Sequence, residues 1–192
     1  MENKLISYFS KMTTLSSEES EAMSGNMLIR QFSKGTLLLK EGQIAVDTYF
    51  IMEGCIRQYF MVDGDEKTTD FYTEDQWVIS LNSLPPVKPS DYFLICNEDT
   101  TVVIGNEKEA LELFKKFPRL EAISREVMQR VFTEQHEKMT SFMTDIPENR
   151  YLKLLKSKPD LVQRIPQYQL ASYIGVKPES LSRIRKRIFV KK

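Results

Sequence analysis

The segment from residue 28 to residue 104 constrains the fold most, because its apolar residues occur in short runs separated by glycine and acidic turns. Short, closely spaced runs of this kind predict the strands of a sandwich or a jelly roll. Residues that tolerate a positive φ follow several runs, as at Gly54 and Gly64. The predicted strands are Thr36–Leu39, Thr48–Met52, Cys55–Val62, Lys67–Thr73, Trp77–Ser80, Asp91–Cys96 and Thr100–Ile104. We therefore predict an α+β fold that begins with a double-stranded β-helix, or jelly roll.

Helical periodicity brackets this β region on both sides. The predicted helices are Lys4–Phe9, Glu18–Met27, Glu107–Phe117, Pro118–Thr144 and Glu148–Lys156. The fourth of these would be roughly 40 Å long at about 1.5 Å per residue. Its first apolar stripe, which we expect to lie on the β roll, consists of Leu120, Ile123, Val127 and Val131. Asp145 and Pro147 then interrupt the helical pattern, and this break is a predicted hinge.

A second apolar stripe on the long helix indicates a dimer. Its spacings are 4, 3, 4 and 3, as in the seam of a coiled coil, and its members are Met128, Phe132, Gln135, Met139 and Phe142. One stripe can cover the roll while the other needs a partner, so we predict a parallel homodimer through this seam. The alternative is that both stripes are buried within one chain, since the seam is barely two heptads long and includes Gln135.

Residues 165–188 have the pattern of two short helices joined by a glycine turn, which is a helix-turn-helix. Gly175 suits the left-handed position that ends the first helix, and Pro178 fits the first turn of the second. Leu181, Ile184 and Ile188 give the second helix one buried face. Its opposite face suits the base edges and phosphates of a DNA major groove. The candidate DNA-binding residues are Glu179, Ser180, Ser182, Arg183, Lys186, Arg187, Lys177 and Gln167.

The charge distribution favours a polyanionic partner for this C-terminal segment. Residues 147–192 hold 12 Lys and Arg against 3 Asp and Glu, a net charge of +9, whereas residues 1–146 hold 15 against 24, a net charge of −9. A basic end on an acidic body is typical of a nucleic-acid-binding protein. Two alternatives stay open: an ordinary amphipathic C-terminal helix with a solvated basic side, and a helix that lies on a membrane surface.

The order of these elements resembles the Crp/Fnr family of bacterial transcription regulators over nearly the whole chain. The motifs that carry the resemblance are the Gly35…Glu41-Gly42 spacing, the strand-turn-strand at residues 49–57, the turn at residues 63–66 and the terminal Leu170-Ala171…Gly175-Val176…Glu179–Arg183. In that family a Glu and an Arg four residues apart contact bases. The resemblance therefore implies that Arg183 donates a bidentate pair to guanine and that Glu179 accepts from cytosine. Pro178 stands where the family often has a basic residue, so the base preference should differ.

The segment that binds the cyclic nucleotide in that family, called the cyclic-nucleotide cassette below, has few of its characteristic residues in this chain. The resemblance places it at residues 77–91, where Ser80 replaces the ribose-binding carboxylate, no arginine is present for the phosphate, and Asp91 adds negative charge. A buried cyclic phosphate would stay uncompensated at a cost of several kcal/mol, so we predict that cAMP does not control the protein. Either another small-molecule effector or none occupies the roll. The candidate effector-pocket residues are Ser80, Leu81, Asn82, Ser83, Lys88 and Ser90.

Metal, cofactor and catalytic chemistry have few candidate residues. Cys55 and Cys96 lie far apart in apolar runs, which favours buried free thiols over a disulfide or a metal site. His136 is the only histidine and lies among charged residues on the long helix, which is typical of a solvated side chain. A cupin-like enzyme would need several converging histidines, and no phosphate loop, nucleophile elbow or Cys/His pair occurs. We therefore predict no metal, no cofactor and no enzymatic activity.

Length and composition agree with a folded protein of one domain and a smaller second one. The chain has 192 residues, of which 41% are hydrophobic and 28% charged. Its apolar runs fall short of the ~20 residues that span a bilayer, and its first residues lack the order of a signal peptide. We expect a cytoplasmic protein without a membrane partner.

These observations support one main interpretation and one alternative. Residues 1–117 are predicted to be a cyclic-nucleotide-binding-like sensor, residues 118–146 a dimerisation helix with its hinge, and residues 147–192 a helix-turn-helix of the winged-helix type. The connection Lys158–Arg164 is short for the two-stranded wing of that type. We predict a homodimer that binds double-stranded DNA as a transcription regulator, with RNA polymerase as a further candidate partner. The alternative is a nucleotide-type small-molecule receptor whose C-terminal helices contact a protein.

Overall fold

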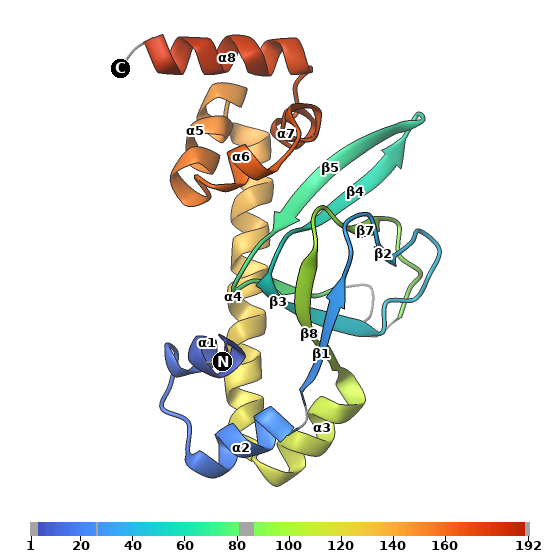
Figure 1. The fold of residues 1–192 in the computed structure, drawn as a ribbon, viewed down its shortest axis with the longest axis vertical. Helices are drawn as coiled ribbons and strands as arrows, with labels where there is room; N and C mark the ends of the chain where they lie inside the picture. The colour runs from blue at the N-terminus through green and yellow to red at the C-terminus, as the bar shows by residue number, and fades with distance from the viewer. Residues whose placement is uncertain (1–3, 26, 81–86, 191–192) are drawn as a thin grey trace. The chain divides into compact units, whose positions relative to one another are not determined.

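The computed structural model describes residues 4–25, 27–80 and 87–190, the side chains of residues 189 and 190 excepted. The chain forms two compact units, which are described separately below (Figure 1). The first unit contains Met1–Gln58 and Phe71–Val131, and the second contains Tyr59–Asp70 and Phe132–Lys192. The division therefore passes through a β-hairpin and through the long helix.

Two four-stranded sheets form the β roll in the described part of the chain. The first has the order β1 (Leu28–Phe32), β8 (Thr100–Asn106), β3 (Asp47–Glu53) and β6 (Trp77–Val78). The second has the order β2 (Leu37–Leu39), β7 (Phe93–Cys96), β4 (Ile56–Val62) and β5 (Asp65–Tyr72). Successive strands alternate between the sheets except at the β4–β5 hairpin, and the pairs β1–β8, β3–β8, β3–β6 and β2–β7 are antiparallel. The prediction of an α+β chain with antiparallel sheets is confirmed.

Strand β1 is the strand that the sequence pattern did not predict. It pairs with β8 along its whole length, from Leu28 opposite Ile104 to Phe32 opposite Thr100. Four of its five residues are exposed, so it has no alternation of buried and exposed positions. Its strand geometry depends on the ladder with β8 rather than on a local pattern.

Helices cover one face of the first sheet. Helices α1 (Lys4–Ser10), α2 (Ser17–Gly25) and α3 (Glu107–Lys116) and the first half of α4 (Pro118–Thr144) all belong to the first unit (Figure 1). The core that they share with β3 and β8 consists of Leu5, Phe9, Met23, Phe50, Val103, Leu120, Ile123 and Val127. Each such side chain stabilises the fold by about 1.5–3 kcal/mol when fully buried. The first predicted stripe of the long helix therefore packs as expected, with Val131 at its partly buried end.

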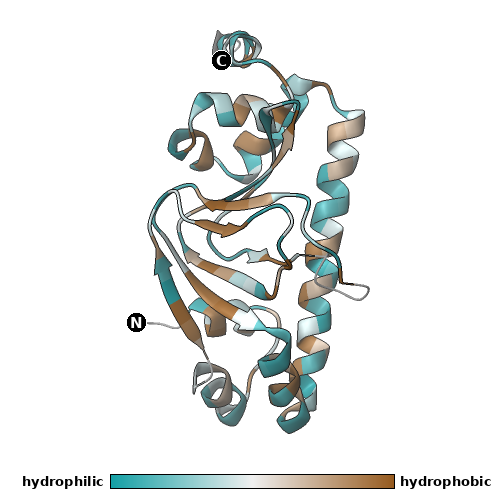
Figure 2. Cartoon of the chain, turned by 90° about the vertical axis from the view of Figure 1, so that its right-hand side faces the viewer, coloured by the Kyte–Doolittle hydropathy of each residue, from teal (hydrophilic) through white to brown (hydrophobic). Residues whose placement is uncertain are grey.

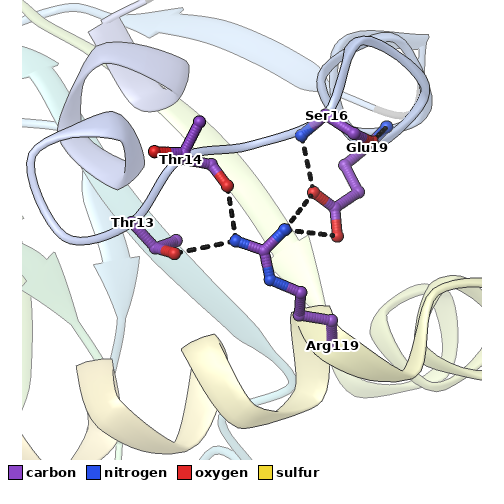
Figure 3. Close-up of polar contacts among 5 residues, drawn as sticks. All are labelled: Thr13, Thr14, Ser16, Glu19 and Arg119. Atoms are coloured by element: carbon purple, nitrogen blue, oxygen red, sulfur yellow. Dashed lines mark hydrogen bonds and ion pairs between the residues drawn. The ribbon is translucent and has the colours of Figure 1, made fainter.

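A network of polar contacts joins α2 to the start of α4 (Figure 3). Ser16 and Glu19 form a capping box, in which the Glu19 amide donates to Ser16 Oγ over 3.1 Å and the Ser16 amide donates to Glu19 Oε2 over 2.7 Å. Arg119 pairs with the same carboxylate at 3.1 Å and also donates to Thr13 Oγ1 and to the Thr14 carbonyl. Because Glu19 is buried, this arginine is what compensates its charge.

The second unit is mainly helical. It contains α5 (Pro147–Ser157), α6 (Leu161–Arg164), α7 (Gln167–Ile174) and α8 (Pro178–Val190), with the second half of α4 and the outer part of the β4–β5 hairpin. Its core residues include Tyr151, Leu154, Leu161, Leu170 and Ile174, which are 5% exposed or less. The connection at residues 158–164, which is short for a two-stranded wing, contains the single helical turn α6. Every element described after β8 is helical.

Hydropathy follows these elements closely. Figure 2 shows apolar colour concentrated on the strands of the roll and alternating apolar and polar colour along α4. Among the described helices, none has both the length and the apolar character that crossing a membrane requires. Helix α4 carries two apolar stripes with different surroundings: the first is packed in the core, and the second is largely exposed.

Candidate nucleic-acid interface

The turn between α7 and α8 is fixed by its backbone. Gly175 adopts φ 78° and ψ 38°, the left-handed conformation. The Val176 amide donates to the Ala171 carbonyl over 2.9 Å and the Gly175 amide donates to the Ser172 carbonyl over 3.0 Å, which together form a Schellman motif. Helix α8 then begins at Pro178, and the amides of Ser180 and Leu181 donate to the Lys177 carbonyl. This geometry sets the direction in which α8 leaves α7.

Helix α8 has one buried face and one charged, exposed face. Leu181 and Ile184 are 1% and 5% exposed, and Ile188 is half-buried at the edge of the same face. On the other face, Glu179 and Arg183 lie one turn apart, and the Arg183 guanidinium donates to Ser180 Oγ over 3.2 Å. The exposed predicted residues of this segment are Lys177, Glu179, Ser182, Arg183, Lys186 and Arg187. The structure thus places these predicted DNA-binding residues together on one accessible surface.

Two of the predicted DNA-binding residues already contact side chains of other helices in the second unit. Gln167, at the start of α7, accepts a hydrogen bond from Arg185. Arg187 forms an ion pair with Glu148 at 3.3 Å. Arg185 was absent from the predicted set, and its half-buried position beside the apolar face of α8 explains why it turns toward α7. Gln167 and Arg187 would have to leave these partners, or share them, in order to contact a nucleic acid.

Arg150 links the predicted hinge to the α7–α8 turn. Its Nη1 donates to the carbonyls of Phe142 and Asp145 over 3.1 and 2.6 Å, and its Nε donates to the Ile174 carbonyl over 2.9 Å. The guanidinium also stacks 4.8 Å from the centre of the Phe142 ring. The helix break at 145–147 is where the sequence placed it, between the end of α4 and the start of α5. The arginine that holds this break was not predicted, because its three carbonyl acceptors come from separate elements.

Asp145 is the charged residue of the hinge. Lys153 contacts its carboxylate at 2.6 Å, and Ser141 donates a further hydrogen bond to it. The hydrogen bond from Lys153, followed by that from Ser141, holds the pKa of Asp145 below its usual value. The carboxylate therefore stays ionised at neutral pH and keeps Lys153 on the hinge.

The predicted dimer seam divides into parts with different surroundings. Phe132, Met139 and Phe142 are 61%, 62% and 55% exposed, as an unpartnered seam requires. Gln135 departs from the seam, because its amide donates to Asp70 over 2.9 Å and its side chain is half-buried. Met128 also departs from it, since it lines a cavity in the first unit. Within the described chain, the seam residues that are exposed for a partner are therefore Phe132, Met139 and Phe142.

Asp70 is the centre of a buried polar cluster in the second unit. It is 2% exposed, and Lys138 Nζ lies 2.7 Å from its carboxylate. Burial, with a smaller contribution from this carboxylate, raises the pKa of Tyr173 on α7. On the same hairpin, the Thr68 amide donates to Ser172 Oγ over 2.9 Å, and Ser172 Oγ donates to the Glu66 carbonyl over 3.1 Å. The outer part of the hairpin is thus bonded to both α4 and α7.

The predicted effector-pocket residues are only partly described. Leu81, Asn82 and Ser83 lie outside the described residues, and Lys88 is exposed. Ser80 and Ser90 are both buried and meet at Tyr92, whose hydroxyl donates to Ser80 Oγ over 2.7 Å. Ser90 Oγ donates to the Tyr92 carbonyl over 2.9 Å. The two serines therefore form part of a packed hydrogen-bonded group.

The two cysteines and the single histidine have different surroundings. Cys55 and Cys96 are free and buried, as predicted. Burial raises the pKa of Cys96 to about 11, so its thiol is protonated and unreactive at neutral pH. His136 is exposed on α4. No three His, Cys, Asp or Glu side chains of the described chain are grouped closely enough to hold a metal ion.

Comparison with known families identifies the β roll. The model of the cyclic nucleotide-binding domain matches residues 29–117. These residues therefore carry the cyclic nucleotide-binding fold. The match ends one residue before α4 and covers neither that helix nor α5–α8. No curated protein sequence matches the chain.

Solved structures extend this likeness over most of the chain. The Catabolite Activator Protein of Thermus thermophilus is 18% identical, with a TM-score of 0.56 over 94% of this chain and 86% of that one. The c-di-GMP responsive global regulator CLP of Xanthomonas campestris is 17% identical, with a TM-score of 0.66 over 92% of this chain and 93% of that one. A Eubacterium rectale protein assigned to the Crp/Fnr family of transcriptional regulators is 16% identical, with a TM-score of 0.68 over 96% and 88%. The cyclic nucleotide-binding fold and the helices that follow it are thus shared at the level of fold.

Proposed function

We propose that the protein is a sequence-specific DNA-binding transcription regulator that acts as a homodimer and is not controlled by cAMP. The observation that carries the proposal is the exposed face of α8, where Glu179 and Arg183 lie one turn apart behind a buried Leu181–Ile184 face. The names of the three solved relatives, an activator protein, a global regulator and a Crp/Fnr regulator, support the same assignment. In this proposal α7 and α8 are a helix-turn-helix, and α8 enters the major groove.

The chemistry of α8 suits base recognition rather than phosphate binding alone. Arg183 can donate two parallel hydrogen bonds to guanine O6 and N7, while the Glu179 carboxylate accepts from the amino group of cytosine. Lys177 and Lys186 at either side are exposed and suit phosphate contacts. The net charge of +9 on residues 147–192 adds the non-specific attraction that brings such a helix to DNA.

The exposed stripe of α4 supports the dimer. Phe132, Met139 and Phe142, together with the 75% exposed Met143, form an apolar surface on a helix that precedes the DNA-binding segment. Large apolar side chains gathered on one helix face mark an interaction surface. A two-fold pair of α8 helices would bind a roughly palindromic site, with half-sites about one helical turn, or 34 Å, apart.

The independence from cAMP follows from the charges around the cassette. Residues 77–91 contain no arginine, and their one lysine, Lys88, is exposed. Ser80 and Ser90 are engaged with Tyr92. A cyclic phosphate bound at residues 77–91 would lack a bidentate arginine from this segment to offset its desolvation, although the domain has the cyclic nucleotide-binding fold.

Selection of bound sequences from random DNA should yield a palindromic site, and fluorescence anisotropy on that site should show binding that weakens steeply as salt rises. The steep slope follows from the release of counterions by the basic residues of the C-terminal segment. Addition of cAMP should leave the affinity unchanged. Enrichment of no sequence, or an affinity that is insensitive to salt, would contradict the DNA-binding proposal and favour a protein partner for α7 and α8.

Replacing Phe132 and Met139 together by glutamate should convert the dimer into a monomer. Two carboxylates buried without cations in the seam should raise the dimer dissociation constant by roughly 100-fold or more. Size-exclusion chromatography with light scattering at micromolar concentration measures this change. The matched control is Thr133→Glu with Thr140→Glu, which adds the same charges to a neighbouring exposed face and should leave the dimer intact. A wild-type chain that is monomeric at this concentration would contradict the dimer.

A further inference from the structure

A cavity of about 550 Å³ lies in the first unit, between the helices and the first sheet. Its walls come from α1, α2, α3, the first half of α4 and strands β3, β6 and β8. They are mainly apolar side chains, among them Phe9, Trp77, Val103, Leu113 and Ile123. Cavities that bind small molecules have volumes of roughly 300–1,000 Å³ and mostly apolar walls. This cavity thus has the size and the character of a small-molecule site.

The cavity is separate from the polar pocket predicted from the sequence. Trp77 and Ile79 line it, whereas the alternate residues Val78 and Ser80 do not. Successive residues of an extended chain point to opposite sides, so the Ser80 side chain lies on the other side of this segment. Ser90 and Lys88 are absent from the lining as well. A ligand in this cavity would therefore contact a different set of residues from the cyclic-nucleotide cassette.

The charges at the cavity exclude an anionic ligand. Within the described residues, the lining contains no Lys, Arg or His, and its charged members are Glu107 and Glu109 at the start of α3. A phosphate or carboxylate in the cavity would lack a cation and would lie near two carboxylates. Ser124 and Asn106 provide polar atoms that suit a hydroxyl or carbonyl group. The charge pattern fits a neutral molecule.

Four exposed residues of the cavity lining are apolar. Ile44, Val46, Val87 and Leu111 belong to the lining and are 45–69% exposed. Four large aliphatic side chains left in water at one cavity are unfavourable by the hydrophobic effect. A hydrocarbon-rich molecule that enters the cavity would cover them and remove this exposed apolar surface.

We propose that this cavity binds a neutral, hydrocarbon-rich small molecule with a single hydroxyl or carbonyl group. Leu120, Ile123, Val127 and Met128 place α4 in direct contact with the bound molecule. The same helix carries the exposed stripe that we assign to the dimer. The role of the molecule as effector rests on the proposed function, whereas its binding does not.

Trp77 provides the test, because it is the only tryptophan of the chain and lines the cavity. Titration of the full-length protein with 1-decanol should give a saturable change in tryptophan emission at micromolar concentration. Decanoate, which has the same chain length and a carboxylate in place of the hydroxyl group, should bind roughly tenfold more weakly because its charge is uncompensated. Equal affinity for the two compounds, or no saturable response to decanol, would overturn the proposal.

A pair of variants locates the site. Ser124→Phe places a large ring at a lining position of α4 and should abolish the response to decanol. Ala122→Phe, at an exposed position of the same helix outside the lining, should retain it. Circular dichroism shows whether each variant is folded. Retained binding in folded Ser124→Phe would place the ligand elsewhere. If Ser124→Phe weakened the dimer and the wild type did not respond to decanol, the cavity would be an interface with a second copy instead.

A separate measurement distinguishes the ligand site from the proposed function. The tryptophan titration requires no DNA, so its failure would overturn the cavity proposal and leave DNA binding untouched. Anisotropy on the selected site, with and without saturating decanol, should show a several-fold change in affinity. An unchanged affinity with intact decanol binding would overturn only the role of the ligand as effector.

Discussion

Arg183→Ala should weaken specific DNA binding by about 1–3 kcal/mol per half-site, or roughly 5- to 150-fold, and should relax the preference at one base pair. The Arg183 guanidinium can make a bidentate contact with guanine, whereas Arg185 and Arg187 contact Gln167 and Glu148. In the described structure it contacts only the Ser180 hydroxyl, on the same helix, so its loss should leave the folded state intact. The measurement is fluorescence anisotropy on the selected site and on variants with each base pair changed in turn.

Lys186→Ala is the matched control for this prediction. Lys186 is also exposed on α8, but its point charge suits phosphate rather than a particular base. Its removal should weaken binding to all sequences by a similar factor and should reduce the salt dependence slightly. If Arg183→Ala behaved in the same uniform way, Arg183 would contact the backbone, and the proposed register of α8 in the groove would be wrong.

Gly54→Ala should destabilise the β roll by about 3 kcal/mol or more, through two separate causes. Gly54 has a φ of +104°, a conformation that costs an L-residue about 1–2 kcal/mol. In addition, a Cβ at this position would lie 2.6 Å from the Asp99 carbonyl oxygen and 2.7 Å from Thr100 Cα, so the backbone itself would have to move. Equilibrium urea unfolding measures the change in the free energy of unfolding.

Gly35→Ala separates these two causes. Gly35 has a φ of +85°, but a Cβ there would meet nothing within 4 Å. This variant should therefore lose only the conformational part, about 1–2 kcal/mol. An equal loss of unfolding free energy in both variants would contradict this prediction. It would show that the turn at Gly54 can shift to accommodate the methyl group, so that the close approach of Asp99 and Thr100 adds no further cost.

The sequence predicted the elements that have a strong local pattern. Helix α4 was predicted with its observed ends, because Pro118 marks its start and the residues around Pro147 stop it. The strands between β2 and β8 were found within a few residues of their ends, because glycine or acidic turns separate most of them. Strand β1 and the single turn of α6 were missed. Strand β1 is exposed at four of its five positions and so shows no alternation, whereas α6 is too short to show a helical period.

The candidate site was predictable to the same extent and for the same reason. The spacing of Leu181 and Ile184 shows which side of α8 is buried, so its exposed residues follow from the sequence. The contacts of Arg150, Gln135 and Ser172 do not follow, since their partners are separated in sequence by up to 106 residues. The sequence around a polar residue in an amphipathic helix does not show which distant group will accept its hydrogen bond. The cavity, which is bounded by seven separate elements, was hidden for the same reason.

The bonds of Ser172 to the β4–β5 hairpin limit how this chain can be recombined. Residues 59–70 belong with the C-terminal helices, although they lie in the sequence between strands of the roll. A chimera that joins another β roll to residues 132–192 would leave Ser172 facing a foreign hairpin, without the Thr68 amide and the Glu66 carbonyl that it now contacts. The exchangeable C-terminal module of this protein is therefore discontinuous, and a working transplant must carry the outer part of the hairpin with it.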